Sequence, residues 1–310
     1  MRVRFLFILC VLVTLSCGSR ARANQLPAND EAKLKADATA AYDARDWAKS
    51  AKLYEEMVSA HPEIPRLWYR LAASQEGLGE LDKSLATFQK AAQLGLPPIF
   101  GEYALATVYA QKNDIENAFV HLQKALDAGY NDPTTLGSDE RLANLRQDAR
   151  FAHLVQAANH NLKPCADTAE NRQFDFWVGE WNVESTEGGV PAGQSKIELI
   201  LGDCVVLENW QSGGNPYSGK SYNIYNASLK RWEQYWVDNS GGNIFFYGNL
   251  KDGVMDYWTD DIPQPDGTKL KRHLQFIKNS PDQVRQFSRG STDGGKTWTV
   301  EYDFTYNRKK

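Results

Sequence analysis

The first half of the chain repeats itself with a period of 34 residues. A shift of this length brings apolar residues onto one another at Tyr54, Phe88 and Leu122. Further positions align in the same way, several of them small: Ser50, Ser84 and Ala118; Ala38, Ala72 and Ala106; Trp47, Leu81 and Ile115. A repeat of this length is typical of a helix pair, which buries its apolar face only against the next pair. The period therefore predicts an all-α solenoid over about residues 31–132.

The small residues at the expected helix crossings make this period resemble the tetratricopeptide repeat (TPR). The second copy matches best, with the consensus residues Trp68, Leu71, Ala72, Gly79, Phe88 and Ala91. The first copy departs from the pattern, because Asp37 stands where a Leu is usual. The resemblance implies three antiparallel helix pairs whose first helices line a concave, peptide-binding groove.

The repeat frame places basic and aromatic side chains in this groove. The expected groove residues are Lys35, Thr39, Tyr42, Arg66, Tyr69, Glu76, Phe100, Tyr103 and Thr107. Exposed aromatic residues beside basic ones are suited to holding an extended protein or peptide segment. The alternative is that Tyr69, Phe100 and Tyr103 pack against a cap or the following domain, which would hide the groove.

The last repeat needs a cap, because no further repeat covers its outer face. Apolar residues recur there at helical spacing: Leu142, Leu145, Phe151, Leu154 and Val155. They predict two short capping helices between residues 138 and 159, with Ser138 as the N-cap of the first. The stretch 159–169 lacks a pattern and is expected to be a linker. We therefore expect a helical domain over residues 24–162 and a second domain over residues 163–310.

From Phe174 onward the sequence changes to short strand-like runs. They are 174–184, 195–202, 204–212, 219–226, 230–238, 242–249, 253–260, 268–277, 282–290 and 297–307. The separators are rich in turn residues, as in Gly213-Gly214-Asn215-Pro216 and Asn239-Ser240-Gly241-Gly242. Antiparallel strands joined in order predict an up-and-down β-barrel, because closure removes exposed edges. The predicted fold class is α+β with two domains, an all-α solenoid followed by the barrel.

Several short motifs in the β half are similar to those of a known group. Gly179-Glu180-Trp181 looks like the Gly-x-Trp of lipocalins and the wider calycin group. The longer set resembles an uncharacterised bacterial calycin-like family: Phe174 to Trp181, Gly202-Asp203-Cys204, Glu208-Asn209-Trp210, Trp232 to Asp238 and Ser291 to Trp298. The resemblance covers about residues 165–308. It implies a barrel that can hold a small molecule, and it carries no assigned reaction.

The motif Ser291 to Trp298 also fits the Asp-box pattern of sialidase propellers. Because the sequence has one copy, a propeller is not expected. In this pattern the Asp accepts hydrogen bonds from backbone N–H groups of a turn, and the Trp packs beneath it. We therefore expect Asp293 and Trp298 to stabilise a hairpin.

Alternation along the strands identifies side chains that face the barrel interior. The predicted ligand-binding residues are Glu208, Trp210, Trp232, Gln234, Trp236 and Arg285. Tryptophans mixed with Gln and Glu favour a cavity that stacks a flat or sugar-like ligand and orients it by hydrogen bonds. Arg285 is expected to enter this cavity and to pair with Glu208. The alternative is a filled barrel in which Glu208, Gln234 and Arg285 form a closed polar network.

The first 23 residues have the pattern of a cleaved targeting segment. Arg2 and Arg4 precede a short apolar run, and Ala21-Arg22-Ala23 fits an A-x-A cleavage site. The apolar run is too short to span a bilayer. We expect export to the periplasm or the medium. The alternative is a lipid anchor at Cys17, although Thr14 stands where a lipobox has an aliphatic residue.

Only Cys165 and Cys204 follow this segment, and two cysteines in an exported chain favour a disulfide. The alternative is two buried free thiols. His273 is the only histidine after residue 170. It shares its predicted strand face with Lys271 and Gln275, so we expect it at the surface. No metal or haem site is therefore predicted.

The sequence lacks the fingerprints of common enzymes: Gly-x-Ser-x-Gly, His-Glu-x-x-His, the P-loop and the dinucleotide motif. The net charge of -4 gives no reason to expect nucleic acid as a partner. No cofactor and no catalytic residue are expected. The leading hypothesis is an exported, non-enzymatic adaptor whose barrel holds a small ligand. The alternatives are a scaffold of an envelope complex with a filled barrel, and an enzyme that uses Glu208 as acid or base.

Overall fold

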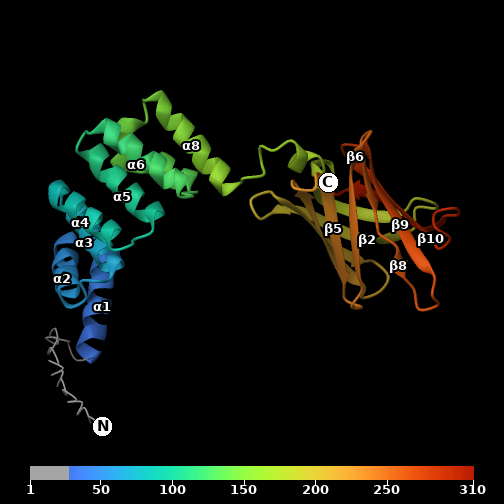
Figure 1. Ribbon diagram of the computed structural model, residues 1–310, viewed down its shortest axis with the longest axis horizontal. Helices are drawn as coiled ribbons and strands as arrows, with labels where there is room; N and C mark the ends of the chain where they lie inside the picture. The colour runs from blue at the N-terminus through green and yellow to red at the C-terminus, as the bar shows by residue number, and fades with distance from the viewer. Residues whose placement is uncertain (1–27) are drawn as a thin grey trace, which may run out of the picture. The chain divides into compact units, whose positions relative to one another are not determined.

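The computed structural model describes residues 28–310 (Figure 1). The expected targeting segment, with its alternative anchor Cys17, lies outside the described residues. The chain divides between Ala125 and Leu126 into two compact units. The first unit is helical, and the second begins with helices and continues as a β-barrel. Over residues 28–310, each helix is too short or too polar to cross a membrane.

The helices of the first unit follow the period of the sequence. The pairs are α1 (Ala28–Asp43) with α2 (Trp47–Ala60), α3 (Pro65–Gly77) with α4 (Leu81–Gln93), and α5 (Pro98–Gln111) with α6 (Ile115–Asp127). The second helices begin at residues 47, 81 and 115, which confirms the 34-residue helix pair. Each pair turns through a left-handed residue, with φ of 56° at Arg45, 76° at Gly79 and 59° at Asn113. The helical part is therefore a TPR-like repeat.

Small side chains let these helices approach closely where they cross. The Ser50 and Ser74 hydroxyl oxygens lie 2.7 Å apart between α2 and α3. The Ser84 hydroxyl of α4 donates to the Ala72 carbonyl of α3 at 2.8 Å. All four residues are fully buried. The repeat therefore has small residues where its helices contact one another. The buried hydroxyls form hydrogen bonds with each other or with a backbone carbonyl instead of with water.

Three short helices open the second unit: α7 (Pro133–Ser138), the 3₁₀ helix η1 (Glu140–Leu145) and α8 (Ala149–Leu162). Their predicted apolar residues Leu142, Leu145, Phe151 and Leu154 are buried. Ser138 is not an N-cap, because it is the last residue of α7. The Asp139 carboxylate, one residue later, accepts from the Arg141 N–H and caps η1. The stretch expected to be a linker begins inside α8, which continues to Leu162.

All ten predicted strands are present, and they close into an antiparallel barrel. They are β1 (Gly179–Ser185), β2 (Pro191–Ile200), β3 (Val205–Ser212), β4 (Ser218–Asn226), β5 (Arg231–Asp238), β6 (Asn243–Lys251), β7 (Val254–Trp258), β9 (Lys269–Ser280), β10 (Gln283–Ser291) and β11 (Thr299–Arg308). Neighbours in this order pair antiparallel, and β11 pairs with β1. The short β8 (Ile262–Pro263) pairs with β9. The predicted fold class, a helical repeat followed by a closed antiparallel barrel, is confirmed.

The first strand begins later than the sequence pattern indicated. Residues 174–178 do not extend β1: they contain the 3₁₀ turn η3 (Asp175–Trp177), and β1 starts at Gly179. Phe174 and Trp177 are three residues apart, so one helical turn brings them to the same side. Their rings stack with centroids 5.0 Å apart, and both are fully buried. The aromatic run therefore fills one end of the barrel instead of pairing with a strand.

Aromatic side chains from several strands complete this filled end. Trp181, Trp232, Tyr257 and Phe276 are fully buried in one core cluster with Phe174 and Trp177. Phe174 makes edge-to-face contacts with Trp232 and Phe276. The space that remains inside the barrel lies further along the same strands, beyond this core.

The predicted disulfide between Cys165 and Cys204 is present, with Cα atoms 4.9 Å apart. It joins the segment after α8 to the turn between β2 and β3. The Cys165 N–H also donates to the Gly202 carbonyl at 3.3 Å. An ion pair between Lys163 and Asp203, at 3.2 Å, reinforces the same attachment.

Candidate ligand-binding site

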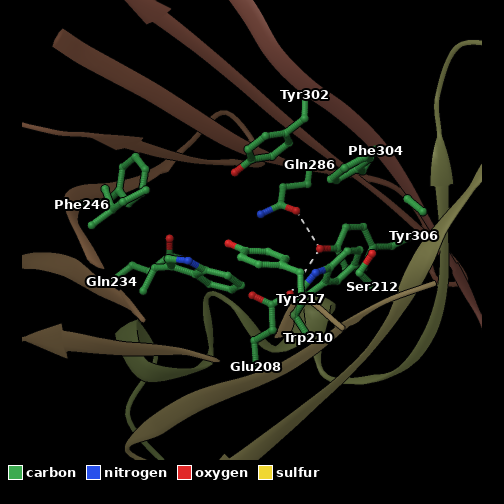
Figure 2. Close-up of a pocket in the computed structure, with 13 residues that line it drawn as sticks. Glu208, Trp210, Ser212, Tyr217, Gln234, Phe246, Gln286, Tyr302, Phe304 and Tyr306 are labelled. Carbon is green, nitrogen blue, oxygen red and sulfur yellow. Dashed lines mark hydrogen bonds between the residues drawn. The ribbon is translucent and has the colours of Figure 1, made fainter. Parts of the chain in front are cut away.

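A cavity of about 330 Å³ lies inside the barrel, beyond the filled end (Figure 2). On β3 and β5 the inward residues pass from the core to the cavity at two-residue steps, so Val206 and Trp232 are in the core while Trp210 and Trp236 line the cavity. The complete lining is Ala192, Glu208, Trp210, Ser212, Tyr217, Gln234, Trp236, Ile244, Phe246, Gln286, Tyr302, Phe304 and Tyr306.

Two tryptophans form much of the apolar wall. Trp210 stacks on Phe304 with ring centroids 5.9 Å apart and an interplanar angle of 18°. A Cβ atom at Gly193 would approach the Trp210 ring to 3.0 Å, and one at Gly219 would clash with the Trp236 ring. The strands thus carry glycine beside each indole, which lets the rings lie over backbone and leaves the centre of the barrel open.

Glu208 is the one carboxyl group among the described residues that line this cavity, and it is 2% exposed. Its Oε1 accepts from the Ser195 hydroxyl at 2.9 Å, and its Oε2 accepts from the Ser221 hydroxyl at 3.0 Å. Burial raises the pKa of Glu208 to about 7, although the hydrogen bonds from Ser195, Ser221 and Tyr306 act in the opposite direction. The side chain therefore changes between its protonated and ionised forms near neutral pH.

Gln234 belongs to a buried amide network that fixes its orientation. The Asn223 amide nitrogen donates to the Val206 carbonyl at 3.0 Å, so the Asn223 side-chain oxygen must face Gln234. The Gln234 amide nitrogen donates to this oxygen at 2.8 Å. Asn223 also donates to the Ser221 hydroxyl, which links Gln234 to Glu208. The Gln234 carbonyl oxygen has no hydrogen-bond partner within the described chain, and Figure 2 shows it directed into the cavity.

Tyr306 connects Glu208 with a residue on the other side of the cavity. Its hydroxyl oxygen lies 2.7 Å from Gln286 Oε1 and 3.2 Å from Glu208 Oε1. Figure 2 shows Glu208 on one side of the cavity and Gln286 with Tyr302 on the other. The Gln286 amide nitrogen makes no hydrogen bond to the part of the chain that the structure describes. The amides of Gln234 and Gln286 therefore each direct one group that has no hydrogen-bond partner among the described residues toward the cavity.

The structure brings four of the predicted ligand-binding residues together: Glu208, Trp210, Gln234 and Trp236 all line the cavity. Trp232 shares their inward face but lies deeper. It is fully buried in the core, and its indole N–H donates to Gln173 at 3.0 Å. Trp232 is therefore a packing residue and does not reach the cavity.

The prediction that Arg285 enters the barrel and pairs with Glu208 is wrong. On β10 the alternate residues Val284 and Gln286 are buried, so Arg285 points outward. Its guanidinium donates to both carboxylate oxygens of Asp303 on β11, at 2.8 and 2.7 Å. Gln286, one residue later, takes the inward position. Among the described residues, Glu208 thus has hydroxyl partners and no cationic one.

The expected surface position of His273 is also wrong. Its side chain is 4% exposed, because its ring stacks on Trp258 at 3.7 Å and Trp298 contacts it from the Asp-box hairpin. Arg289 donates to its Nδ1 at 3.0 Å, so Nε2 carries the proton toward Asp256. Burial lowers the pKa of His273, although the Asp256 hydrogen bond raises it. This outward cluster stabilises the barrel wall.

Several cavity residues were missed at the level of sequence: Phe246, Gln286, Tyr302, Phe304 and Tyr306. Tyr302, Phe304 and Tyr306 alternate along the last strand, and this spacing is a signal for one inward aromatic face. Gln286 had no such signal, because its face could be assigned only with the strand register.

The predicted groove residues of the repeats fall into three groups. Lys35, Thr39 and Arg66 line a depression between α1 and α3, together with Arg70 and Glu31. Outside this depression, three of the predicted aromatic residues are half-buried and one is exposed. These are Tyr42, which lies under the Arg70 guanidinium at 4.0 Å; Tyr69, packed on Phe88 at 5.4 Å; Tyr103; and Phe100, which is 56% exposed.

Glu76 and Thr107, also expected in the groove, are buried instead. Glu76 accepts from the Gln111 amide, and the Thr107 hydroxyl donates to the Ala104 carbonyl at 2.8 Å. Both side chains are satisfied inside the helix stack and are not available to a partner.

Comparison with known proteins finds no matching family model and no matching curated protein. Among solved structures, the chain is similar to a CopN–Scc3 complex, with a TM-score of 0.33 and 22% identity over 39% of this chain and 72% of that chain. It is also similar to the chaperone SycD of Yersinia enterocolitica, with a TM-score of 0.34 and 16% identity over 44% and 87% of the two chains. A third similar structure is the TPR2B domain of yeast Sti1 in its pHsp70 complex, with a TM-score of 0.31 and 19% identity over 42% and 95%.

Proposed function

We propose that the protein is an exported, non-enzymatic binding protein. Its barrel holds a small organic molecule in the cavity around Glu208, and its helical repeats contact a protein or peptide. The cavity is the observation that carries this proposal. At about 330 Å³ it lies at the lower end of the usual range for ligand pockets, so a compact molecule of one or two rings fits.

The lining has the composition of a small-molecule site. Trp210, Trp236 and Phe304 offer flat apolar surfaces, and only a few polar groups converge between them. Sites of this kind obtain affinity from apolar contact and orientation from a small number of hydrogen bonds. The carbonyl oxygen of Gln234 and the amide nitrogen of Gln286 are placed to supply that orientation.

Calorimetric titration with a panel of uncharged aromatic and sugar-like compounds tests the barrel. Trp236→Ala should weaken binding by about tenfold or more, because it removes one apolar wall. Tyr235→Ala is the matched control: it lies next to Trp236 on β5, points outward and is 47% exposed. It should bind like the wild type. Absence of binding to the wild type, or equal loss in both variants, would refute the barrel proposal.

The repeats support the second half of the proposal through the depression between α1 and α3. Lys35 and Arg66 are exposed there, and Arg70 adds a third cation. The charge favours a segment that carries acidic side chains. We propose an extended acidic peptide segment as the partner of this groove.

Selection from a display library of ten-residue peptides on the immobilised full chain tests the groove. The selected peptides should be enriched in Asp and Glu. The double variant Lys35→Glu/Arg66→Glu should lose them, while Lys90→Glu on the second helix of the next pair should retain them. Selection of peptides without acidic enrichment, or retention by the double variant, would rule out this groove as the site.

An enzyme that uses Glu208 is the second candidate function, favoured by the pKa of about 7 of this buried carboxyl. It predicts that a bound compound is chemically altered and that Glu208→Gln stops the reaction. Export is proposed from the sequence pattern of residues 1–23. Mass spectrometry of the protein from its native cells should find a mature chain that begins after Ala23, or a lipid on Cys17 if the anchor is used.

A further inference from the structure

The hydrogen bonds around Tyr306 contain a conflict that has two solutions. The hydroxyl lies within hydrogen-bond distance of two oxygens, Oε1 of Gln286 at 2.7 Å and Oε1 of Glu208 at 3.2 Å. A phenol has one proton and can donate to only one of them. For both contacts to be hydrogen bonds, one more proton must lie in this chain of groups, or the Gln286 amide must turn over.

The first solution places a proton on Glu208. Each oxygen of the Glu208 carboxyl accepts from a serine, Oε1 from Ser195 and Oε2 from Ser221, but Oε1 is the one within hydrogen-bond distance of Tyr306, so a proton shared with Tyr306 lies on Oε1. The acid then donates to Tyr306, and Tyr306 donates to Gln286 Oε1. In this arrangement the Gln286 amide nitrogen faces the cavity as a hydrogen-bond donor.

The second solution leaves Glu208 ionised. Tyr306 then donates to the carboxylate, as Ser195 and Ser221 do. The Gln286 amide must turn over so that its nitrogen donates to Tyr306, and its oxygen faces the cavity. Both amides, Gln234 and Gln286, now present acceptors, beside a buried negative charge.

The two arrangements differ in the ligand that they accept. Gln234 presents its carbonyl oxygen in both, because Asn223 fixes it. With Glu208 protonated, the two amides offer one acceptor and one donor to the cavity, and Glu208 is uncharged. With Glu208 ionised, both amides offer acceptors, and the buried charge repels anions. A primary or secondary amide attached to an aromatic ring, which both donates and accepts, matches the first arrangement.

Resting on the proposed binding function, we propose that the barrel selects an uncharged aromatic amide or lactam, which donates to Gln234 and accepts from Gln286, and that Glu208 holds a proton while this ligand is bound. Tyr306 couples the protonation of Glu208 to the orientation of the Gln286 amide. The ligand and the proton therefore bind together, and a carboxylate analogue of the same shape is excluded.

The groups around the Glu208 carboxyl stay neutral over the pH range in which Glu208 titrates. They are hydroxyls and amides from each neighbouring element: Ser195 of β2, Ser221 and Asn223 of β4, Gln234 of β5, Gln286 of β10, and Tyr302 and Tyr306 of β11. The two tyrosines are the titratable ones, and burial raises the pKa of both above their ordinary value. They stay neutral where Glu208 titrates, so Glu208 alone sets the charge.

The test uses 2-naphthamide and 2-naphthoate, two probes of nearly equal shape, in calorimetric titrations of the full chain. At about pH 6 the amide should bind at least about tenfold more tightly than the carboxylate. Between about pH 7 and pH 9 the amide affinity should fall by close to tenfold per pH unit, because one proton must be taken up. Glu208→Gln, whose amide imitates the protonated acid, should bind 2-naphthamide with the same affinity at all these pH values. Tyr306→Phe, which breaks the link between Glu208 and Gln286, should remove the pH dependence of amide binding.

Infrared difference spectra between the wild type and Glu208→Gln test the proton without any ligand. The band of a protonated carboxyl should be present at about pH 6 and absent at about pH 9. Its absence at the lower pH, or amide binding that does not change with pH, would overturn this coupling while leaving the binding function standing. If neither probe nor any compound of the wider panel binds, the binding function itself fails, whatever the carboxyl does.

Discussion

At the scale of single residues, the barrel assigns its inward tryptophans to two different roles. Trp181 is fully buried, its indole N–H donates to the Trp177 carbonyl at 2.9 Å, and the Arg308 guanidinium lies 4.2 Å above its ring. Trp236 is half-buried at the cavity, and its indole N–H reaches Asp238 at 3.2 Å. The first side chain is enclosed on all sides, whereas the second has one face toward empty space.

We therefore expect the two truncations to have different effects. Trp181→Ala should lower the free energy of unfolding by about 3–5 kcal/mol, because a large core side chain leaves a cavity. Trp236→Ala should lower it by less and should mainly weaken ligand binding. Urea denaturation followed by circular dichroism measures both. If Trp236→Ala destabilises the barrel as much as Trp181→Ala, Trp236 is a core residue and the cavity has no open wall there.

The buried carboxyl of Glu208 gives the stability of the barrel a characteristic dependence on pH. Its pKa is about 7 in the fold against an ordinary value of 4.5, so the folded state binds the proton more tightly than the unfolded chain. The favourable contribution is complete below about pH 4.5 and is lost as the pH rises through about 7. Relative to Glu208→Gln, the wild type should lose on the order of 3 kcal/mol of unfolding free energy across this range. Denaturation curves of the two proteins whose difference does not change with pH would contradict this.

At the scale of elements, the hairpin between β10 and β11 shows how one carboxylate organises a turn. Asp293 accepts from the N–H groups of Lys296 and Thr297 at 3.0 and 2.9 Å. These bonds hold the pKa of Asp293 below its ordinary value. The turn delivers Trp298 to the outer wall, where it contacts His273. The structure thus agrees with the structural role predicted for the Asp-box.

Replacing Asp293 with Ala should loosen this hairpin. We expect the melting temperature of the barrel to fall by a few degrees and the emission of Trp298 to shift toward that of an exposed indole. Lys296→Ala, in the same turn and with an exposed side chain, serves as control and should melt like the wild type. Equal melting temperatures of the two variants would mean that the turn does not depend on the Asp293 carboxylate.

At the scale of the whole molecule, the two kinds of architecture depend on different contacts. The repeats are built from helices that pack against their neighbours in sequence. The barrel closes through distant pairs such as Trp181 with Arg308, and the Cys165–Cys204 disulfide ties the preceding segment to it. Non-local pairing makes the barrel the slower part to fold but does not require the repeats.

A fragment that begins at Lys163 should therefore be soluble and should show a strong β signal by circular dichroism. The matched fragment that begins at Leu126 adds α7, η1 and α8, which belong to the same compact unit. Both should have the same near-ultraviolet aromatic spectrum. Aggregation of the shorter fragment, with recovery in the longer one, would show that these helices share a core with the barrel.

Features that depend on neighbours along the chain could be predicted from the amino-acid pattern. The 34-residue period placed the helix pairs, and alternation with turn residues placed ten strands and four of the cavity residues. The wrong prediction for a single element also comes from a local pattern. The aromatic run from Phe174 was assigned to a strand, although a spacing of three residues between Phe174 and Trp177 is also compatible with one helical turn.

The depth of a side chain in the barrel and its hydrogen-bond partners depend on how the strands are arranged in the folded protein. Alternation divides a strand into two faces, but a register error of one residue exchanges them, and this is how Arg285 was placed inside instead of Gln286. Alternation also does not show how far along the barrel axis a residue lies. This position separates Trp232 in the core from Trp236 in the cavity. The chain from Glu208 through Tyr306 to Gln286 joins β3, β11 and β10, and barrel closure alone brings these strands to face one cavity. Such contacts depend on how the ring closes, so they are set by the folded molecule and not by local pattern.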